Sequence, residues 1–285
     1  MQKSAKRGER GKNVPPLLRK TVWLLLSFQH NQTEENYAMQ ILISIDDTDN
    51  LESPGTGVLA SRIAADLESN GWGKSSFVTR HQLLVHPDIP YTSHNSSMCF
   101  SADIDEDCLA RVITYAANFL ASESAAGSDP GLCVAVLDRM PESGGLIRFG
   151  QAAKESVLTK KSAYECAQLL GVHLSEHGGT GQGVIGALAG AGLRLGGNDG
   201  RLRGQLVFTE TGGVVSVAAL RGRADVDEVR ALDGSAVTNR DIVRVGEKVK
   251  TVLLDGHSVL LVVAADGMTN GVRWQTCSRQ LLKKY

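Results

Sequence analysis

Three carboxylates stand within four positions of the chain, at Asp46, Asp47 and Asp49. Like charges this close repel one another and raise one another's pKa, so the cluster is favourable only in a solvated loop or around a cation. Carboxylate oxygens are the hard ligands that Mg²⁺ prefers. The residues therefore predict a catalytic magnesium site, and the alternative is an ordinary turn with helix-capping aspartates.

The elements around the acids are expected to place them beside an anion site. Residues 41–45 are apolar and rich in β-branched side chains, which predicts a buried strand that ends at the cluster. The loop at 53–57, Ser-Pro-Gly-Thr-Gly, leads into an apolar helical stripe over 58–67. Flexible glycines and the N–H groups of the helix start would then lie next to the acids. Such a geometry suits a magnesium-bound phosphate.

A second glycine-rich stretch occupies residues 179–188. Gly181, Gly183 and Gly186 match Gly-x-Gly-x-x-Gly, but the acidic residue expected about twenty positions later is missing, and no Walker A Lys-Ser/Thr follows. The residues alone leave two interpretations open, which are close packing of a small-residue helix and a backbone that approaches a ligand. His177, beside this stretch, is a better candidate for proton transfer than His81 or His94.

Four further residues are expected to contact the substrate. They come from a strand-like run at 75–85 and from the loop before the next strand, and one strand pair could bring them to the same sheet edge as donors to a phosphate or carbonyl. These residues are Arg80, His81, His94 and Asn95. Either histidine also fits a hydrogen-bonded structural role, and the spacing does not indicate zinc.

A group of cations accompanies the helical segments that follow residue 139. An ordinary solvated helix face is the plain interpretation of such lysines and arginines, and phosphate binding is the alternative. The group consists of Arg148, Lys154, Lys160 and Lys161.

The order of elements over residues 39–138 is βαββαβ, which predicts a ferredoxin-like unit within an α+β fold. Glycine-rich residues 139–150 are expected to be a loop, and the rest of 139–223 is expected to contain helices, the glycine loop and a hairpin formed by 205–209 and 214–221. Residues 224–285 predict a small β-rich domain. Residues 1–38 are interpreted as a dispensable, disordered extension, because Met39 stands two residues before the first predicted strand. Their apolar run at 22–28 is too short to span a bilayer, and the alternative of a signal peptide lacks a strong apolar region and a clear cleavage site.

The composition is that of a soluble globular protein. The chain has 285 residues, 42% hydrophobic and 21% charged, with a formal net charge of −1. This balance excludes a generally basic surface for nucleic acid and leaves a local patch open. The five cysteines include no Cys-x-x-Cys pair, so we expect no zinc ribbon and a reducing, cytoplasmic setting. We expect no membrane segment, because the apolar run at 22–28 is too short.

Several short motifs, in order, resemble the archaeal 2-agmatinylcytidine synthetases that modify an isoleucine tRNA. The first is Ile-Asp-Asp-Thr-Asp at 45–49, and the others are Ile89-Pro-Tyr91 with Asn95, Asp129-Pro-Gly-Leu132 and the stretch 179–188. Together they cover residues 39–222. The chain departs from the family at Thr56-Gly57-Val58, where the family carries a Cys-Thr pair, and it lacks the cysteines of the family's zinc ribbon.

The resemblance implies an ATP- and Mg²⁺-dependent ligase or kinase-like transferase, which activates an oxygen or amide of a tRNA base or a small molecule. It implies magnesium-ATP near the three acids, and it implies tRNA or a small amine such as agmatine as partner. The expected nucleotide contacts are Thr48, Gly55, Thr56, Gly57, Gly179, Thr180, Gly181 and Gly183. The alternative is a non-catalytic protein that binds an amine or a nucleotide. The oligomeric state stays open, with a homodimer among the options.

Overall fold

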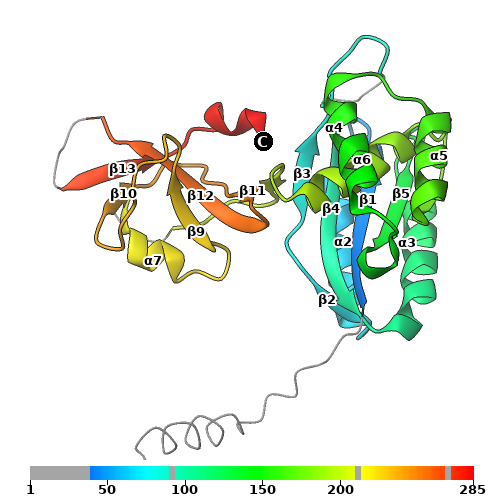
Figure 1. Cartoon of the computed structure of the whole chain (residues 1–285), viewed down its shortest axis with the longest axis horizontal. Coiled ribbons are helices and arrows are strands. Elements are labelled where there is room, and N and C mark those ends of the chain that lie inside the picture. The colour runs from blue at the N-terminus through cyan, green and yellow to red at the C-terminus, as the bar shows by residue number, and fades with distance from the viewer. Residues whose placement is uncertain (1–38, 90–93, 209–212, 267–270) are drawn as a thin grey trace, which may run out of the picture. The chain divides into compact units, whose positions relative to one another are not determined.

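The computed structural model describes residues 39–89, 94–208, 213–266 and 271–285 (Figure 1). The expected extension at 1–38 lies outside the described residues, as do Pro90 and Tyr91 of the Ile-Pro-Tyr motif. The described part has an α+β fold with a large mixed sheet and several helices, which confirms the predicted fold class at that level. Among the described residues, no helix combines the length and the apolar character needed to cross a membrane.

The first part of the sheet is built around β1, the apolar run that ends at the acids. β1 pairs antiparallel with β4 on one side and with β5 on the other. A strand with neighbours on both edges and helices on both faces must be apolar throughout, which explains its sequence. The strand order is β6-β5-β1-β4-β3, with β2 also paired to β4. The bounds are β1 Met39–Asp46, β2 Gly73–Ser75, β3 Thr79–Gln82, β4 Ser96–Ile104, β5 Gly131–Val136 and β6 His173–Glu176.

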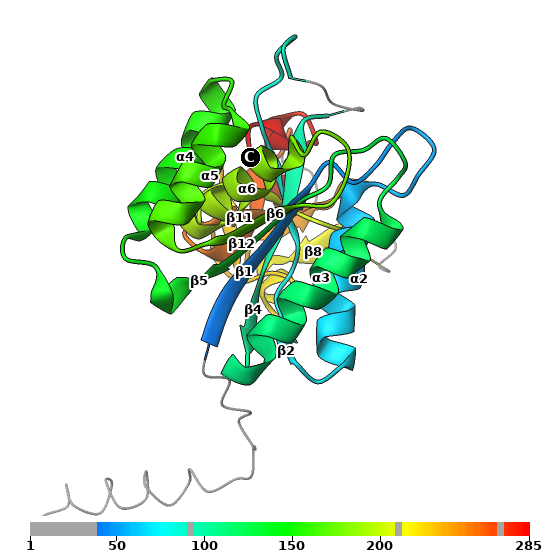
Figure 2. The same cartoon turned by 90° about the vertical axis from the view of Figure 1, so that its right-hand side faces the viewer.

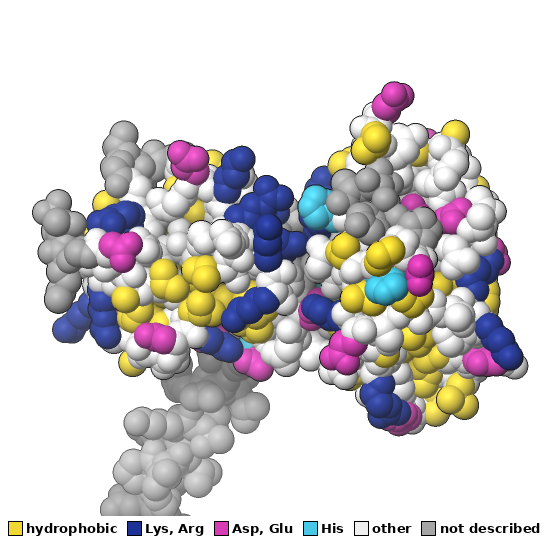
Figure 3. Space-filling model, turned by 90° about the horizontal axis from the view of Figure 1, so that it is seen from above, with side chains coloured by type: hydrophobic (Ala, Val, Ile, Leu, Met, Phe, Trp, Pro, Cys, Tyr) yellow, Lys and Arg dark blue, Asp and Glu magenta, His cyan; other side chains and the backbone are white. Residues whose placement is uncertain are grey.

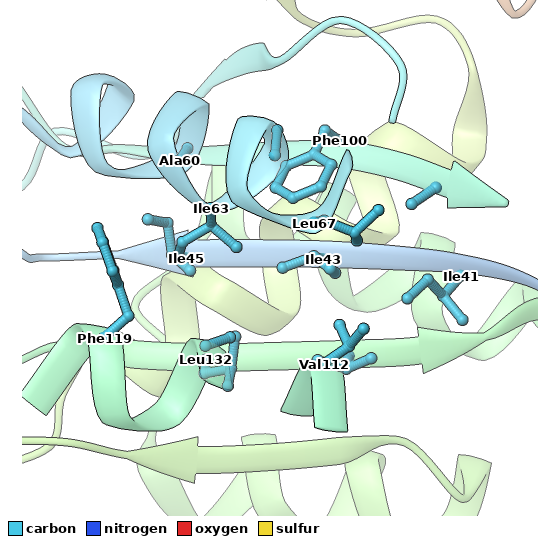
Figure 4. Close-up of a cluster of buried hydrophobic side chains, with 14 of the residues drawn as sticks. Ile41, Ile43, Ile45, Ala60, Ile63, Leu67, Phe100, Val112, Phe119 and Leu132 are labelled. Carbon is cyan, nitrogen blue, oxygen red and sulfur yellow. The ribbon is translucent and has the colours of Figure 1, made fainter. Parts of the chain in front are cut away.

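Helices cover both faces of this part of the sheet (Figure 2). Ile41, Ile43 and Ile45 of β1 point to the layer formed by α2 and α3, where they meet Ile63 and Phe119 (Figure 4). The alternate residue Leu42 packs into the opposite layer, formed by α4, α5 and α6. The bounds are α2 Thr56–Ser69, α3 Leu109–Glu123, α4 Ser143–Glu155, α5 Lys160–Leu170 and α6 Gly183–Gly196, with short 3₁₀ turns at η1 Glu106–Cys108 and η2 Leu137–Arg139.

The expected loop at 139–150 is largely helical, because α4 already begins at Ser143. The glycines there serve close helix packing. A Cβ added to Gly150 would lie 2.8 Å from the Ala189 carbonyl oxygen of α6, and one added to Gly192 would lie 2.0 Å from the Leu146 carbonyl oxygen of α4. The contact between α4 and α6 therefore overrides the low helix propensity of glycine.

The sheet continues through β7, which pairs with β3 and also with β11. The order then runs β11-β12-β13-β10-β8, and β9 pairs parallel with β12. These later strands and α7 enclose a core of their own that contains Val229, Leu260 and Trp274. The bounds are β7 Arg201–Leu202, β8 Val214–Ser216, α7 Val217–Arg221, β9 Glu228–Ala231, β10 Ile242–Arg244, β11 Val252–Leu254, β12 His257–Ala264, β13 Val272–Thr276 and η3 Leu281–Lys284.

The two runs expected to form a hairpin have other partners among the described residues. Leu206 forms a bridge with Val249, and β8 pairs with β10. Residues 217–221 form the helix α7, whose start is capped by the Ser216 hydroxyl accepting from the Ala219 amide. A local N-cap thus ends the strand that alternation alone would have extended.

Candidate functional site

A cavity of about 310 Å³ opens where β1 ends. Polar and apolar segments that are distant in the sequence line it together. The polar lining includes the three acids, Gly55 to Gly57, Arg80, His94, Asn95 and Ser96, and the apolar lining includes Leu83, Ile89, Met98, Ala153, Val157, Leu158 and Ile185. This mixture suits a ligand with both a charged and an apolar portion.

Asp46 is the last residue of β1 and is only 8% exposed. Its Oδ1 accepts a hydrogen bond of 2.9 Å from the Asp47 amide. Burial first, and the charge of Asp47 second, raise the pKa of Asp46 to about 8. Helix α6 presses against the carboxyl group, since a Cβ added to Gly186 would lie 1.6 Å from Asp46 Oδ2.

Asp47 has a positive φ of 50°, a region that non-glycine residues rarely adopt. Such backbone strain concentrates at functional sites. Burial raises its pKa to about 6, and the charges of Asp129 and Asp49 add to the effect. Sequence reasoning does not single out Asp129 as a site residue, although it stands in one of the matching motifs. Its backbone N–H donates to the Asp47 carboxylate.

Asp49 lies at the start of α2. The Thr56 hydroxyl donates a hydrogen bond of 3.2 Å to Asp49 Oδ1. Helix α2 has Gly55 as its N-cap, with no side-chain capping hydrogen bond and no acidic residue in its first turn. The partial positive charge of this helix end is thus directed at the cavity that Gly55, Thr56 and Gly57 line.

The chemistry of the acids fits a hard cation. Asp46, Asp47 and Asp49 offer only oxygen ligands, with the Thr56 hydroxyl beside them, and the raised pKa values of Asp46 and Asp47 show how unfavourable their negative charges are without a cation. Within the described residues, however, no group of three or more His, Cys, Asp or Glu side chains is already arranged to hold a metal ion. The carboxylates would have to turn towards the ion.

The second glycine stretch divides into two parts. Gly183 lines the cavity together with Gly186, whereas Gly179, Thr180 and Gly181 do not. The Thr180 amide and hydroxyl both donate to the Asp129 carboxylate, so these donors already have an acceptor. A Cβ on Gly183 would lie 2.1 Å from the Asp129 carbonyl oxygen. Close packing therefore accounts for the glycines that begin α6.

Three other predicted site residues lie outside the cavity. His177 Nε2 lies 2.8 Å from Ser175 Oγ on the edge strand β6. Thr48 is 1% exposed, and its hydroxyl has no hydrogen-bond partner among the described residues. His81 is fully buried, with Nδ1 3.0 Å from Asp199 Oδ1 and Nε2 2.7 Å from Thr79 Oγ1. The hydrogen bonds of His81 give it a structural role in this network.

The remaining expected substrate contacts do line the cavity. Arg80 Nε donates a hydrogen bond of 2.9 Å to Ser96 Oγ across the β3–β4 pair. Asn95 Nδ2 donates to the Leu84 carbonyl oxygen at 2.6 Å and thereby fixes the loop that carries His94. Sequence reasoning missed the wall formed by residues 153–158 at the end of α4, which carries no motif and reaches the cavity only through helix packing.

No protein-family model matches the chain, and no curated protein matches it. Solved structures of TiaS do match in part. A complex of TiaS with its isoleucine tRNA, AMPCPP and agmatine is 23% identical with a TM-score of 0.47, covering 54% of this chain and 36% of that chain. A complex with the same tRNA and ATP is 24% identical with a TM-score of 0.48 and the same coverage.

Apo TiaS, an agmatidine synthetase for an isoleucine tRNA, is 23% identical with a TM-score of 0.46, covering 54% of this chain and 35% of that chain. This chain thus spans about a third of the length of the TiaS structures that it matches.

Proposed function

We propose that the protein is an ATP- and Mg²⁺-dependent enzyme that activates an oxygen or amide of a second substrate, either a tRNA base or a small molecule. The observation that supports this function is the meeting of three acids with the start of α2 on one cavity. Phosphoryl and nucleotidyl transfer need little covalent machinery from a protein. They need a metal to neutralise charge and donors to position oxygens.

The described residues divide this work between them. Asp46, Asp47 and Asp49 would hold Mg²⁺, which when bound neutralises charge on the phosphates. The backbone at Gly55, Thr56 and Gly57 would orient the phosphate oxygens at the helix start. The apolar wall leaves room for a base or an alkyl chain of the second substrate, with Arg80, His94 and Asn95 as its polar contacts. His177 has no part in this assignment, because it does not line the cavity.

Thermal unfolding of the whole chain with Mg²⁺, with ATP and with both tests this proposal. A ligand at about a hundred times its dissociation constant adds about 2.7 kcal/mol to the stability of the native state. We expect the full shift only with both ligands, and its loss in Asp47→Asn, since asparagine tolerates the positive φ while removing the charge. Asp107→Asn, an exposed acid away from the cavity, serves as the control. No shift with any combination would contradict the proposal.

Release of ADP, or of AMP and pyrophosphate, then identifies the bond that is broken. The sequence motifs resemble enzymes that join agmatine to a tRNA. We would therefore test tRNA and agmatine first as candidates for the second substrate. Turnover of ATP that rises when one of them is added would name the substrate class.

A non-catalytic binding protein is the second candidate. The observation that favours it is that the acids are not arranged as a metal group within the described residues, while a buried carboxylate cluster beside apolar side chains suits an alkyl amine. Calorimetric titration with agmatine in the absence of Mg²⁺ and ATP tests this function. Binding without any ATP turnover would favour it over the enzyme.

We also propose the domain division 39–138, 139–223 and 224–285, with a ferredoxin-like unit in the first segment. The strand order β5-β1-β4-β3, with α2 and α3 on one face, supports the ferredoxin-like unit. The core around Val229 and Trp274 also contains Leu206, Val215, Val217 and Leu220, which precede residue 224, so it supports a separate β-rich portion but not the exact boundary at 224. All five cysteines are free thiols, in keeping with a cytoplasmic location as part of the proposal.

A further inference from the structure

Four cations follow one another across adjacent strands of the sheet. Arg80 of β3 and Arg201 of β7 stand directly opposite each other, and Arg201 stands opposite Val252 of β11. Directly opposed residues share a sheet face, so Arg80 and Arg201 project from the same one. Arg203 follows β7 and Lys250 precedes β11, and the charges of Arg201, Arg80 and Arg203 all act on Lys250. Arg80, Arg201, Arg203 and Lys250, called the cation row below, therefore lie close together.

The cation row lacks carboxylate partners. Within the described residues, none of its four members lies at ion-pair distance from an Asp or Glu, although Asp49 and Asp199 act on Arg80 and Arg201 from farther away. Lys154 already holds the Asp199 carboxylate. Lys and Arg side chains also gather visibly on the face shown in Figure 3. Burial first, and repulsion from neighbouring cations second, lower the pKa of Arg80, Arg201 and Lys250. The repelling cations are Arg279 for all three, Arg201 for Arg80 and Lys250, and Arg80 and Arg203 for Lys250.

The four cations for which the sequence left phosphate binding as an alternative do have carboxylate partners. Arg148 pairs with Glu142, Lys154 with Asp199, Lys160 with Glu176 and Lys161 with Glu165. Their charges are balanced within the chain, and the solvated-face interpretation suits them. The members of the cation row, by contrast, have no ion pair with a carboxylate among the described residues.

Arg201 gives the strongest single observation. It is only 9% exposed, and its Nε has no hydrogen-bond partner among the described residues. A buried, unsatisfied donor on a charged group is destabilising, because the group has lost water without gaining a partner. A ligand oxygen would remove that penalty.

The cation row begins at the cavity. Arg80 lines it. Arg203 lies across the start of α2, since a Cβ on Gly57 would be 2.9 Å from Arg203 Nε, and Arg203 Nη1 donates to Ser61 Oγ at 2.9 Å. From there Arg201 and Lys250 continue the row away from the acids along the sheet. A group bound on the row would thus be continuous with a substrate in the cavity.

We propose that the cation row binds a phosphate group carried by the second substrate of the cavity. The planar guanidinium groups match the paired oxygens of a phosphate, and Lys250 adds a point charge. That the phosphate belongs to the second substrate rests on the proposed function, whereas the binding of a phosphate to the cation row does not. The phosphate could belong to a small phosphate ester or to a phosphodiester chain, and probes of different size distinguish these two ligands.

Binding of two probes, without Mg²⁺ and ATP, tests the row independently of the metal site. The probes are inorganic pyrophosphate, followed by calorimetry, and a fluorescent single-stranded RNA of about six nucleotides, followed by anisotropy. We expect Arg201→Gln and Lys250→Gln each to weaken binding about tenfold, the scale of one charge-assisted contact. The charge-matched controls Arg148→Gln and Lys161→Gln should change it less than about twofold. Lys250 is only half-buried, so its variant keeps the test valid if Arg201→Gln does not fold.

The outcomes separate the alternatives. Tight pyrophosphate binding with weak RNA binding identifies a small phosphate ester. Tighter RNA binding, whose log–log salt slope shrinks by about 0.7 for each cation removed, identifies a phosphodiester chain. Equal losses in row and control variants, or no binding of either probe, would overturn the proposal. Row-dependent binding in a protein that shows no joint shift with Mg²⁺ and ATP would keep the phosphate site and reject the proposed function.

Discussion

Asp46 occupies its position because Gly186 leaves room for it. Its carboxyl group lies buried at the end of a central strand, and α6 approaches so closely that no side chain fits between them. The acid is held by this packing and by the hydrogen bond from the Asp47 amide, and it has no salt bridge among the described residues. Two experiments test the consequences most directly. One adds a methyl group at Gly186, and the other changes the protonation of Asp46 through the pH.

Gly186→Ala is expected to destabilise the protein by about 1–3 kcal/mol, because its Cβ would collide with Asp46 and displace either the carboxyl group or the helix. It should also weaken the joint effect of Mg²⁺ and ATP. Gly196→Ala in the same helix meets only an ordinary contact of 3.5 Å with Ile147 and should be neutral or stabilising. Urea unfolding of both variants measures the difference, and equal stabilities would show that the close approach is unimportant.

The stability of the metal-free protein should fall as pH rises. The folded-state pKa of Asp46 is raised from 3.8 to about 8, so over that range the native state binds more protons than the unfolded state. The free energy of unfolding then decreases with increasing pH and levels off above about pH 8. Asp46→Asn should flatten this decline. Urea unfolding at pH 5, 7 and 9 with EDTA checks it, and parallel curves for the two proteins would exclude the effect.

At the scale of elements, local periodicity and tertiary packing account for different parts of the fold. The helices α2 and α3 could be predicted because their apolar residues recur with the helical period, and the strand β1 because it is a short, continuous apolar run rich in β-branched residues. The start of α4 could not, since its glycines matter through contacts with α6, which is distant in the chain. The acids and the loop before α2 could be found from sequence motifs, because these residues are neighbours along the chain.

The parts of the site that sequence reasoning missed come together only in three dimensions. The wall at 153–158 follows from how α4 lies on α6, and Asp129 reaches Asp47 because β5 pairs beside β1. The position of His81 reflects the same limitation. Alternation on β3 puts Arg80 on the cavity side and turns its neighbour His81 to the opposite face, where Asp199 and Thr79 are its partners.

Asp129 is expected to couple the loop before α6 to the acid cluster. Its carboxylate accepts from both donors of Thr180, and its backbone N–H donates to Asp47. Asp129→Ala should free the Thr180 amide and raise its hydrogen-exchange rate by about tenfold or more, while amides of β4 stay unchanged. Asp105→Ala, an exposed acid at the start of η1, is the control. Unchanged exchange at Thr180 would contradict the coupling.

At the scale of the whole molecule, separate cores share one sheet. The short strand β7 pairs with β3 and with β11, yet the clusters around Ile43 and around Trp274 have no residue in common. A ladder this short is a weak connection between two hydrophobic cores. Cooperativity should therefore be limited.

Trp72 and Trp274 can report on the two cores separately. Trp72 packs edge-on against Tyr115 in one, and Trp274 is buried in the other with its indole N–H donating to Asp241 at 3.0 Å. With Trp23 replaced by Phe in every protein, variants that retain a single tryptophan are expected to unfold at different urea concentrations by fluorescence. Coincident midpoints would instead make residues 39–285 one cooperative unit and remove the basis for a separate domain around Trp274.

The close packing of α6 limits which amino-acid substitutions the protein tolerates. Any replacement of glycine adds at least a Cβ, and at Gly186, Gly190 and Gly192 that atom would fall within 2.2 Å of a neighbour. Every missense change in these codons is thus expected to be selected against, whatever the amino acid and whether or not it touches a ligand. A saturation library would show three intolerant positions along one helix. Gly190 and Gly192 would mark its packing against the sheet and against α4, and Gly186 would also mark the wall of the cavity.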